Sequence, residues 1–342
     1  MNLKKLAAAA LLTGLFASPA AAEDGGLRWQ SGDWAFTARV AASAQTGEAD
    51  DTLPPRADQP EQLEGFIRLN GDWTSEDGWL AGINLDFSTS DRETEALNTG
   101  EMYVYLASEF GRIEIGKQDG AADALALRTP VVALGQVRGD FARYAGTQAQ
   151  LSAYDSGDAA KIIYLSPPKG GLRVGVSWAP RDERDDIGPF EVDQRDVVEL
   201  GAQFERPVGD WVLGVSAGYV TSQSAGDTAD IESWSVGAEA KRGPLRLGGG
   251  YVDRGDSNQL VVSFDQREWS FGAAWVEERW GLAASAAWST ASNFDNRLAG
   301  VGGYYDITDY VTLRADVVHV DEDRGLGSNR GWVGLAEIEF HY

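Results

Sequence analysis

The stretch Trp211–Tyr219 reads WVLGVSAGY and alternates between two kinds of side chain. Its even-numbered positions are mostly glycine and serine, whereas its odd-numbered positions are apolar or aromatic: Trp211, Leu213, Val215, Ala217 and Tyr219. A period of two residues indicates a β-strand with two different faces, because successive side chains of a strand point to opposite sides. A helix would repeat its apolar positions every 3.6 residues, a period that is nearly absent from this chain.

Segments of the same kind recur from residue 33 to the end of the chain, separated by clusters of Gly, Asp, Asn, Pro and Ser that favour turns. Tight connections alternate with long polar ones. We predict sixteen strands, over residues 33–46, 63–74, 79–90, 101–109, 112–118, 160–168, 171–178, 196–206, 210–221, 230–241, 244–253, 266–277, 280–290, 297–306, 310–320 and 331–342. An even number of strands leaves both ends of the chain on one side of a closed sheet.

The positions of the aromatic residues indicate what surrounds this sheet. Most of them, such as Trp34, Trp73, Trp211 and Trp280, fall at or near the ends of predicted strands. Aromatic rings prefer the headgroup level of a bilayer, so an apolar band with rings at both rims is typical of a lipid-facing barrel wall. A soluble all-β protein also alternates, but its apolar face would carry large aliphatic side chains. We therefore expect an all-β, 16-stranded antiparallel transmembrane β-barrel, whose Gly- and Ser-rich face suits a wet lumen.

Composition excludes several other classes of protein. The chain has 53 acidic and 29 basic residues among 342, a net charge of −24, and no cysteine. Nucleic-acid binding needs basic clusters, which are absent from the sequence. Without cysteine, neither disulfides nor a thiolate zinc site can form. A mean hydropathy of −0.29 excludes a bundle of transmembrane helices, each of which needs about 20 nearly uncharged residues.

The N-terminus has the layout of a secretory signal peptide, which we place at residues 1–22. Lys4 and Lys5 precede the apolar run Leu6–Phe16, and the small residues Ser18–Ala22 follow it. Cleavage would leave a mature barrel of residues 23–342 with a charge of −26, after loss of the two lysines. Export through the inner membrane is the expected consequence, which leaves the periplasm, the outer membrane or the medium as the final site. Together with the lipid-facing barrel wall, it predicts the cell outer membrane.

The connection over residues 119–159 is far longer than the others and has little strand pattern. Its apolar residues, among them Leu125, Leu134, Phe141 and Tyr154, require a surface to pack against. A sixteen-stranded barrel has a lumen wider than its side chains fill. We therefore expect this third loop to fold into the lumen and narrow it, with a short helix over residues 121–127.

Three segments resemble the Gram-negative general diffusion porins of the alphaproteobacterial type. Glu101–Ala121 (EMYVYLASEFGRIEIGKQDGA) is similar to the strand, turn and strand before their constriction loop. Arg68–Trp73 (RLNGDW) resembles their second strand, and Ile162–Leu172 (IIYLSPPKGGL) the strand and turn after the loop. The C-terminal aromatic residue is Tyr342, where the family usually has Phe. The resemblance implies a homotrimer in the outer membrane, in contact with lipid and lipopolysaccharide, that passes small hydrophilic solutes.

The resemblance also implies a constriction in which loop acids face a basic wall, so that a transverse field orients the solutes. Glu101 stands where the family often has Arg, so we expect a less positive wall and, given the net charge, a preference for cations. The expected constriction residues are the wall residues Arg39, Arg68 and Glu101, the loop acids Asp119, Asp123, Asp140, Asp155 and Asp158, and Lys161 where the loop returns. Trimer contacts are expected from Val40, Ala42 and residues 88–100.

Two other functions of such a barrel remain open. A substrate-specific channel for sugars or anions on the same barrel would use lumen rings, and Tyr103, Tyr105 and Tyr164 would supply them only in the right strand register. A structural barrel would have a plugged lumen and no conductance.

Enzymatic and metal-dependent functions have weaker support. Gly214–Gly218 fits the G-x-S-x-G pattern of hydrolases, but that motif needs a strand-to-helix elbow, whereas Ser216 falls in the middle of a predicted strand. We therefore expect no enzymatic activity. Acidic stretches such as 182–186 and 321–323 offer oxygen ligands for a divalent cation, but no calcium-loop pattern is present, and solvated loop charges are the favoured interpretation. We expect no cofactor.

Overall fold

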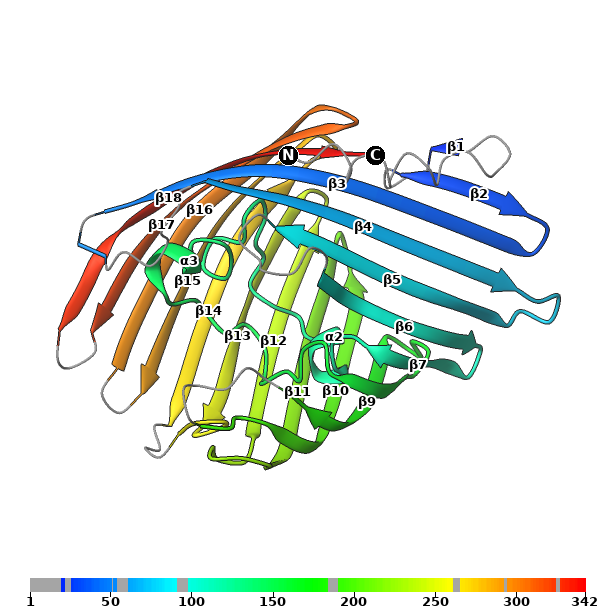
Figure 1. Ribbon diagram of the computed structural model, residues 1–342, viewed down its shortest axis with the longest axis horizontal. Coiled ribbons are helices and arrows are strands. Elements are labelled where there is room, and N and C mark those ends of the chain that lie inside the picture. Colours follow the sequence, from blue (N-terminus) through cyan, green and yellow to red (C-terminus); the bar gives the residue numbers. More distant parts are fainter. Residues whose placement is uncertain are drawn as a thin grey trace.

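A computed structural model of the chain describes residues 20–21, 26–50, 52–53, 61–90, 98–183, 190–260, 265–291, 294–323 and 327–342. Sixteen long strands run antiparallel in chain order, and the last pairs with the first of them, so that the sheet closes into a barrel (Figure 1). The strands are β3 (Trp34–Ala49), β4 (Glu61–Thr74), β5 (Leu80–Ser90), β6 (Asn98–Ser108), β7 (Gly111–Lys117), β8 (Ala160–Leu165), β9 (Leu172–Asp182), β10 (Gln194–Val208), β11 (Trp211–Ser224), β12 (Glu232–Arg242), β13 (Leu245–Gly255), β14 (Gln266–Val276), β15 (Trp280–Ala291), β16 (Phe294–Thr308), β17 (Val311–Asp323) and β18 (Ser328–His341). The predicted sixteen-stranded barrel is confirmed.

Two further short strands lie at the barrel seam. β2 (Leu27–Ser31) pairs with the beginning of β3, and β1 (Ala20–Ala21) pairs with β2. The pairing of β18 with β3 ends at Val40, which exchanges backbone hydrogen bonds of 2.9 and 2.8 Å with Tyr342. β2 therefore covers the part of the β3 edge that β18 leaves free. Most of the predicted signal peptide lies outside the described residues.

Strand boundaries differ from the predicted ones mainly at the end of the barrel where the connections are long. β3 continues to Ala49 and β16 already begins at Phe294, because regular pairing extends into polar sequence. By contrast β8 ends at Leu165, earlier than predicted, since Pro167 and Pro168 cannot donate ladder hydrogen bonds. The opposite end has tight turns, such as Gly209–Asp210 between β10 and β11, where Gly209 has a φ of 61°.

The outer face of the barrel is apolar and has aromatic residues at both ends. On β9, the outward side chains Leu172, Val174, Val176 and Trp178 are each more than 40% exposed. Near the end with long connections, rings of adjacent strands touch, with 4.4 Å between the ring centres of Tyr251 and Trp269. Near the other end, outward rings include Trp275, Trp280, Tyr305, Tyr310 and Tyr342. This is the surface that a lipid-embedded barrel requires.

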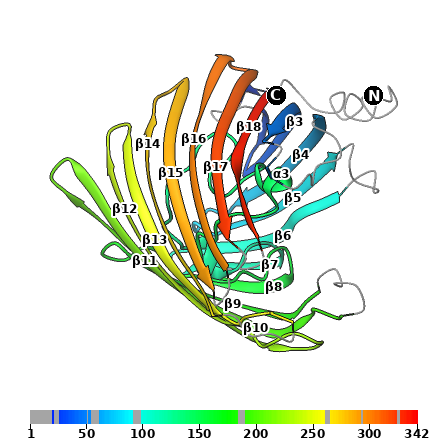
Figure 2. The ribbon, with the colours of Figure 1, turned by 90° about the vertical axis from the view of Figure 1, so that its left-hand side faces the viewer.

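The connection between β7 and β8 lies inside the barrel, and Figure 2 shows it within the ring of strands. It contains two one-turn helices, α2 (Ala121–Ala124) and α3 (Ala142–Ala145), of which α2 is shorter than the predicted helix. Among the described residues, no helix is long and apolar enough to cross a membrane. The buried loop side chains Phe141, Tyr144 and Leu151 form a cluster with inward residues of β15–β18, such as Leu298 and Val318.

The part of the wall on which this loop packs is rich in glycine. At Gly201, an added Cβ would overlap the carbonyl oxygen of Ala121, and at Gly237 it would overlap that of Leu127. On β9–β16, the glycines whose added Cβ would come within 3.4 Å of a loop atom form what we call the glycine track: Gly175, Gly201, Gly214, Gly218, Gly237, Gly248, Gly272, Gly300 and Gly302. The expectation that the Gly- and Ser-rich face is wet is therefore wrong for the middle of β9–β16, because the loop covers it.

Candidate functional site

The loop is fastened to the wall through its own backbone. Inward-facing serines of three strands accept hydrogen bonds from loop N–H groups, at 3.0, 2.8 and 2.9 Å: Ser177 from Ala121, Ser216 from Leu127 and Ser233 from Tyr154. Buried N–H groups are costly when unpaired, so these acceptors fix the path of a segment that has little secondary structure. Ser216, at the centre of the G-x-S-x-G pattern, therefore has a structural partner. A hydrolase would also need a base, and His319, one of the two histidines of the chain, lies on the opposite, outward face of the barrel against Trp332. These positions do not form a nucleophile–base pair.

The middle of the loop, at residues 134–136, is held by one carboxylate. Asp316 on β17 accepts hydrogen bonds from the Gln136 backbone N–H at 2.7 Å, from the Gln136 side-chain amide at 2.9 Å and from the Leu134 N–H at 3.4 Å. Gln136 has a φ of 42°, a left-handed conformation that non-glycine residues rarely adopt. The three hydrogen bonds compensate for this local strain and hold the loop against the wall.

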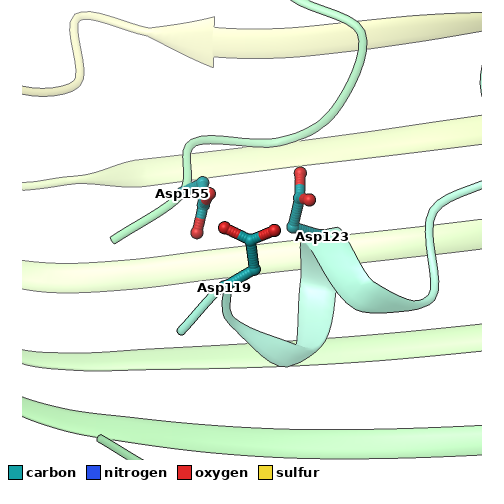
Figure 3. A group of neighbouring side chains, drawn as sticks. All are labelled: Asp119, Asp123 and Asp155. Carbon is teal, nitrogen blue, oxygen red and sulfur yellow. The ribbon is translucent and has the colours of Figure 1, made fainter. Parts of the chain in front are cut away.

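Three of the expected loop acids come together. Asp119, Asp123 and Asp155 each place a carboxylate oxygen within 4.8 Å of the other two (Figure 3). Asp123 pairs with Arg128 and accepts a hydrogen bond of 2.7 Å from Ser152, whereas Asp119 is exposed to solvent. Carboxylates are ligands that calcium and magnesium prefer, but calcium takes six to eight oxygens, more than these three side chains supply. The expected lack of a cofactor stays a prediction.

The crowding of these acids changes their protonation. Partial burial, followed by the neighbouring carboxylates, Asp155 first, raises the pKa of Asp119 to about 6. Burial also raises the pKa of Asp155. Burial would raise the pKa of Asp123 as well, but Arg128 and Ser152 bring it below its usual value. Glu101 on β6 and Asp158 also contribute to the shift at Asp119, so both belong to the same electrostatic neighbourhood.

The expected basic wall is present, but its charges are paired. Arg39 and Arg68 are cross-strand partners on β3 and β4, and both point inward. Arg68 donates from Nε to both carboxylate oxygens of Asp86, at 2.8 and 3.0 Å, and Arg39 lies 3.8 Å from Glu339. Arg314 on β17 similarly pairs with acids of β18, at 2.6 Å to Glu337 and 2.9 Å to Glu339. The wall therefore offers few uncompensated positive charges.

The other two expected residues lie apart from this cluster. Asp140 accepts a hydrogen bond of 2.5 Å from Gln45 on β3 and lines a hollow of about 510 Å³ between the loop and the wall, together with Arg314 and Glu64. Lys161 points inward but is fully buried, with Nζ 2.7 Å from the Gly157 carbonyl oxygen and 3.9 Å from Glu199. The expectation that Lys161 lines the aqueous constriction is therefore wrong. Lys161 lies beneath the returning loop and holds the C-terminal end of the loop to β10.

The strand register settles the three tyrosines that the sequence left open. Tyr103 and Tyr105 pair with Asn84 and Gly82 of β5 on the inward face. Tyr164 pairs with Ile113, and both are more than a third exposed on the outer face.

The acidic partners of the wall arginines were not expected. Asp86, Glu114, Glu337 and Glu339 point to the same inward face as the arginines that they contact on the same or a neighbouring strand. Parity within a correct register is thus the signal that would have found them. Of the proposed acidic stretches, residues 184–186 lie outside the described residues, and Asp321 pairs with Arg330 at 2.8 Å. Residues 91–97, within the expected trimer contact 88–100, lie outside them too.

Comparison with known proteins gives a consistent picture. Residues 7–325 match the family model described as Gram-negative porin. A porin of Rhodobacter capsulatus is 24% identical over 264 residues, which cover 75% of this chain and 80% of the relative. Solved structures with the same fold include a mutant of the Rh. blastica porin (14% identity, TM-score 0.62) and an anion-selective porin from Comamonas acidovorans (15%, 0.62). Each of these two covers 90% of this chain and is itself covered completely.

Proposed function

The chain belongs to the Gram-negative porin family and forms an outer-membrane channel, and from that premise we propose that its channel is water-filled, prefers cations and passes small hydrophilic solutes by diffusion. The observation that carries the cation preference is the charge of the wall that the loop leaves uncovered. On β3–β7, three inward arginines face five inward acids: Arg39, Arg68 and Arg112 against Glu64, Asp72, Asp86, Glu101 and Glu114.

The loop adds to this excess on the other side of the passage. Asp119, Asp155 and Asp158 lie at its ends, beside Asp123, which pairs with Arg128. A narrow aqueous passage lined by one sign of charge raises the local concentration of counter-ions. This arrangement supports selection by charge and size rather than bond-making chemistry.

Reversal potentials test the proposal. Purified protein in a planar bilayer, with a tenfold KCl gradient across it, should give a reversal potential of the sign expected for potassium permeation. A potential near zero or of the opposite sign would contradict cation preference. Absence of conductance from correctly folded protein would contradict the open channel and favour the structural barrel.

We also propose that the barrel is a homotrimer. Small outward side chains gather on β3 and the last strands, where most of the outer wall carries large ones: Ala42, Ala44, Thr46, Ala315, Gly334 and Ala336. All of them except Ala42 line shallow hollows on the outer wall, and small residues let two membrane-embedded surfaces approach closely. Conductance that rises in groups of three equal steps, together with a heat-sensitive trimer band on gels, is the expected result. A protein that runs only as a monomer after mild extraction would contradict it.

The predicted export signal is a separate proposal. Removal of residues 1–22 leaves Glu23 as the first residue of the mature chain. Sequencing the N-terminus of protein purified from outer membranes tests this, and an intact Met1 would contradict it.

A further inference from the structure

The uncovered wall carries two aromatic side chains that have no part in holding the loop. Tyr103 and Tyr105 both point inward from β6, with 6.3 Å between ring centres and 48° between ring planes. Both are only partly buried. An aromatic ring at the edge of an aqueous passage exposes apolar surface, so it calls for a ligand or a packing partner.

Tyr105 is held flat against the wall. Its ring lies over Gly82, where any Cβ would overlap the ring, and its hydroxyl donates a hydrogen bond to Asp72. The Arg112 guanidinium lies 3.6 Å above the ring centre and also pairs with Glu114. Glycine below, guanidinium above and carboxylates at both edges therefore fix one orientation of the ring and of the arginine.

Tyr103 lies beside an unused hydrogen-bond donor. Its partner across the strand pair is Asn84, which is 5% exposed and whose Nδ2 has no hydrogen-bond partner among the described residues. Buried polar groups of proteins are almost always paired. Asn84 therefore supplies an unused amide donor beside a partly exposed ring.

We propose that these residues form a weak binding site for neutral sugars, a proposal that rests on the channel function above. We call Asp72, Asn84, Tyr103, Tyr105, Arg112 and Glu114 the tyrosine patch. A sugar ring presents a face of C–H groups that packs on an aromatic ring, and hydroxyls that both donate and accept. The patch offers the partly exposed ring of Tyr103, a guanidinium donor that is clamped on Tyr105, an unpaired amide donor and carboxylate acceptors within one stretch of wall.

Charge excludes the anionic relatives of these ligands. Arg112 is matched by Glu114, and Asp72 adds a negative charge to the patch. Two charges outside the patch also act on Tyr103: Glu101 is negative, and the positive Arg68 is paired with Asp86. A phosphorylated or carboxylated sugar would therefore be repelled, while a neutral one is not. The inferred ligand class is neutral mono- and oligosaccharides.

The patch lies after the constriction for a solute that enters from the end with long connections. Glu101 is in the electrostatic neighbourhood of the loop acid Asp119, and Tyr103 and Tyr105 follow it along β6 toward the tight turn at residues 109–110. A solute released from the narrowest point therefore meets the rings next. Weak binding there would make sugar passage saturable without closing the channel.

The test is single-channel recording with maltotriose added to the purified protein. The wild-type conductance is expected to fall with a saturable dependence on sugar concentration, accompanied by excess current noise. Tyr103→Ala is expected to weaken the apparent affinity about tenfold, and Tyr103→Phe, which keeps the ring, should retain most of it. Tyr164→Ala removes an outward tyrosine of β8 and should leave the affinity unchanged.

Each outcome decides the proposal. A conductance decrease that only follows bulk viscosity, and that a polyethylene glycol of equal size reproduces, would overturn it. So would an equal response of Tyr103→Ala and wild type, or tighter binding of a sugar phosphate than of the neutral sugar. Heat-modified mobility on gels shows which variants have folded barrels. A folded wild type without conductance would instead contradict the channel function itself.

Discussion

The inner wall of this barrel has two halves that differ in side-chain size. In the middle of β9–β16 the inward residues are small, and the glycine track lets the loop backbone contact the strands. On β3–β7 several inward residues are large and charged, and some of them pair across strands, as Arg68 does with Asp86. One half is a seat for the loop, and the other is the wall of the passage.

This difference explains how one connection can narrow a wide lumen without blocking it. The loop is held mainly on one side, by serine acceptors, by Asp316 and by the apolar cluster around Phe141, and it meets the facing wall at the hydrogen bond between Asp140 and Gln45 of β3. On the facing side, the charged side chains form ion pairs with their neighbours on the wall, such as Arg68 with Asp86, and therefore do not extend across the lumen. The position of the passage therefore follows from where the wall has glycine and where it has arginine and acid.

The largest expected effect comes from a substitution in the glycine track, on which the loop packs. In Gly237→Ala the new methyl group would overlap the carbonyl oxygen of Leu127, so the loop backbone must move. Overpacking of this kind costs about 1–3 kcal/mol. We expect a lower unfolding temperature, measured by heat-modified mobility on gels, together with a larger and noisier unit conductance.

The matched control is Gly327→Ala. Gly327 is an exposed glycine just before β18 whose added Cβ would meet nothing within 4 Å. It should leave the unit conductance at the wild-type value. Equal conductance of both variants would break the distinction between seat and passage.

Sequence alone was sufficient for the barrel because each strand carries its own two-residue period, and aromatic residues mark its ends. It also located the loop, whose 41 residues have no such period. It could not say what covers the Gly- and Ser-rich face, because small residues suit both water and a closely packed backbone. Only the three-dimensional path of the loop separates these two cases.

The site was less predictable for a related reason. Arg39 and Arg68 could be placed on the inward face by parity, but their partners Glu339 and Asp86 depend on which strands are neighbours and in what register. Lys161 has inward parity like the arginines, yet it is buried, because the loop returns directly above it. Parity gives the face of a residue, whereas exposure on that face depends on the loop.

The second-largest effect is expected from removing the carboxylate that holds the middle of the loop. Asp316→Ala removes the acceptor of three hydrogen bonds from Leu134 and Gln136. Hydrogen bonds to a charged group contribute about 1.5–3 kcal/mol each, and buried N–H groups would be left unpaired. We expect more open-channel noise and faster proteolysis within residues 119–159. A quiet channel with the wild-type digestion pattern would show that the apolar cluster alone holds the loop.

A smaller effect is expected from the charges of the passage. Arg39→Ala with Arg68→Ala removes two positive charges opposite the loop acids, so cation preference should increase, seen as a larger reversal potential in a salt gradient. Arg297→Ala removes an outward arginine of β16 and serves as the control. Unchanged potentials in the double variant would remove both arginines from the constriction.

The smallest effect is the response to pH. Because partial burial and neighbouring carboxylates raise the pKa of Asp119 to about 6, its carboxyl group is ionised above that pH and neutral below it. Lowering the pH from 8 to 5 should therefore reduce cation selectivity, with a midpoint about pH 6. Reversal potentials recorded across this range measure the step.

Asp119→Asn gives the matched comparison, since an amide of the same shape does not titrate in this range. At every pH, the variant should have the cation selectivity that the wild type shows at pH 5, and it should lack the step about pH 6. Persistence of that step in the variant would assign the titration to another acid of the cluster, with Asp155 the next to be replaced, because burial raises its pKa as well. A step that disappears places the exposed carboxylate of Asp119, rather than the wall arginines, as the charge that passing ions meet at the loop.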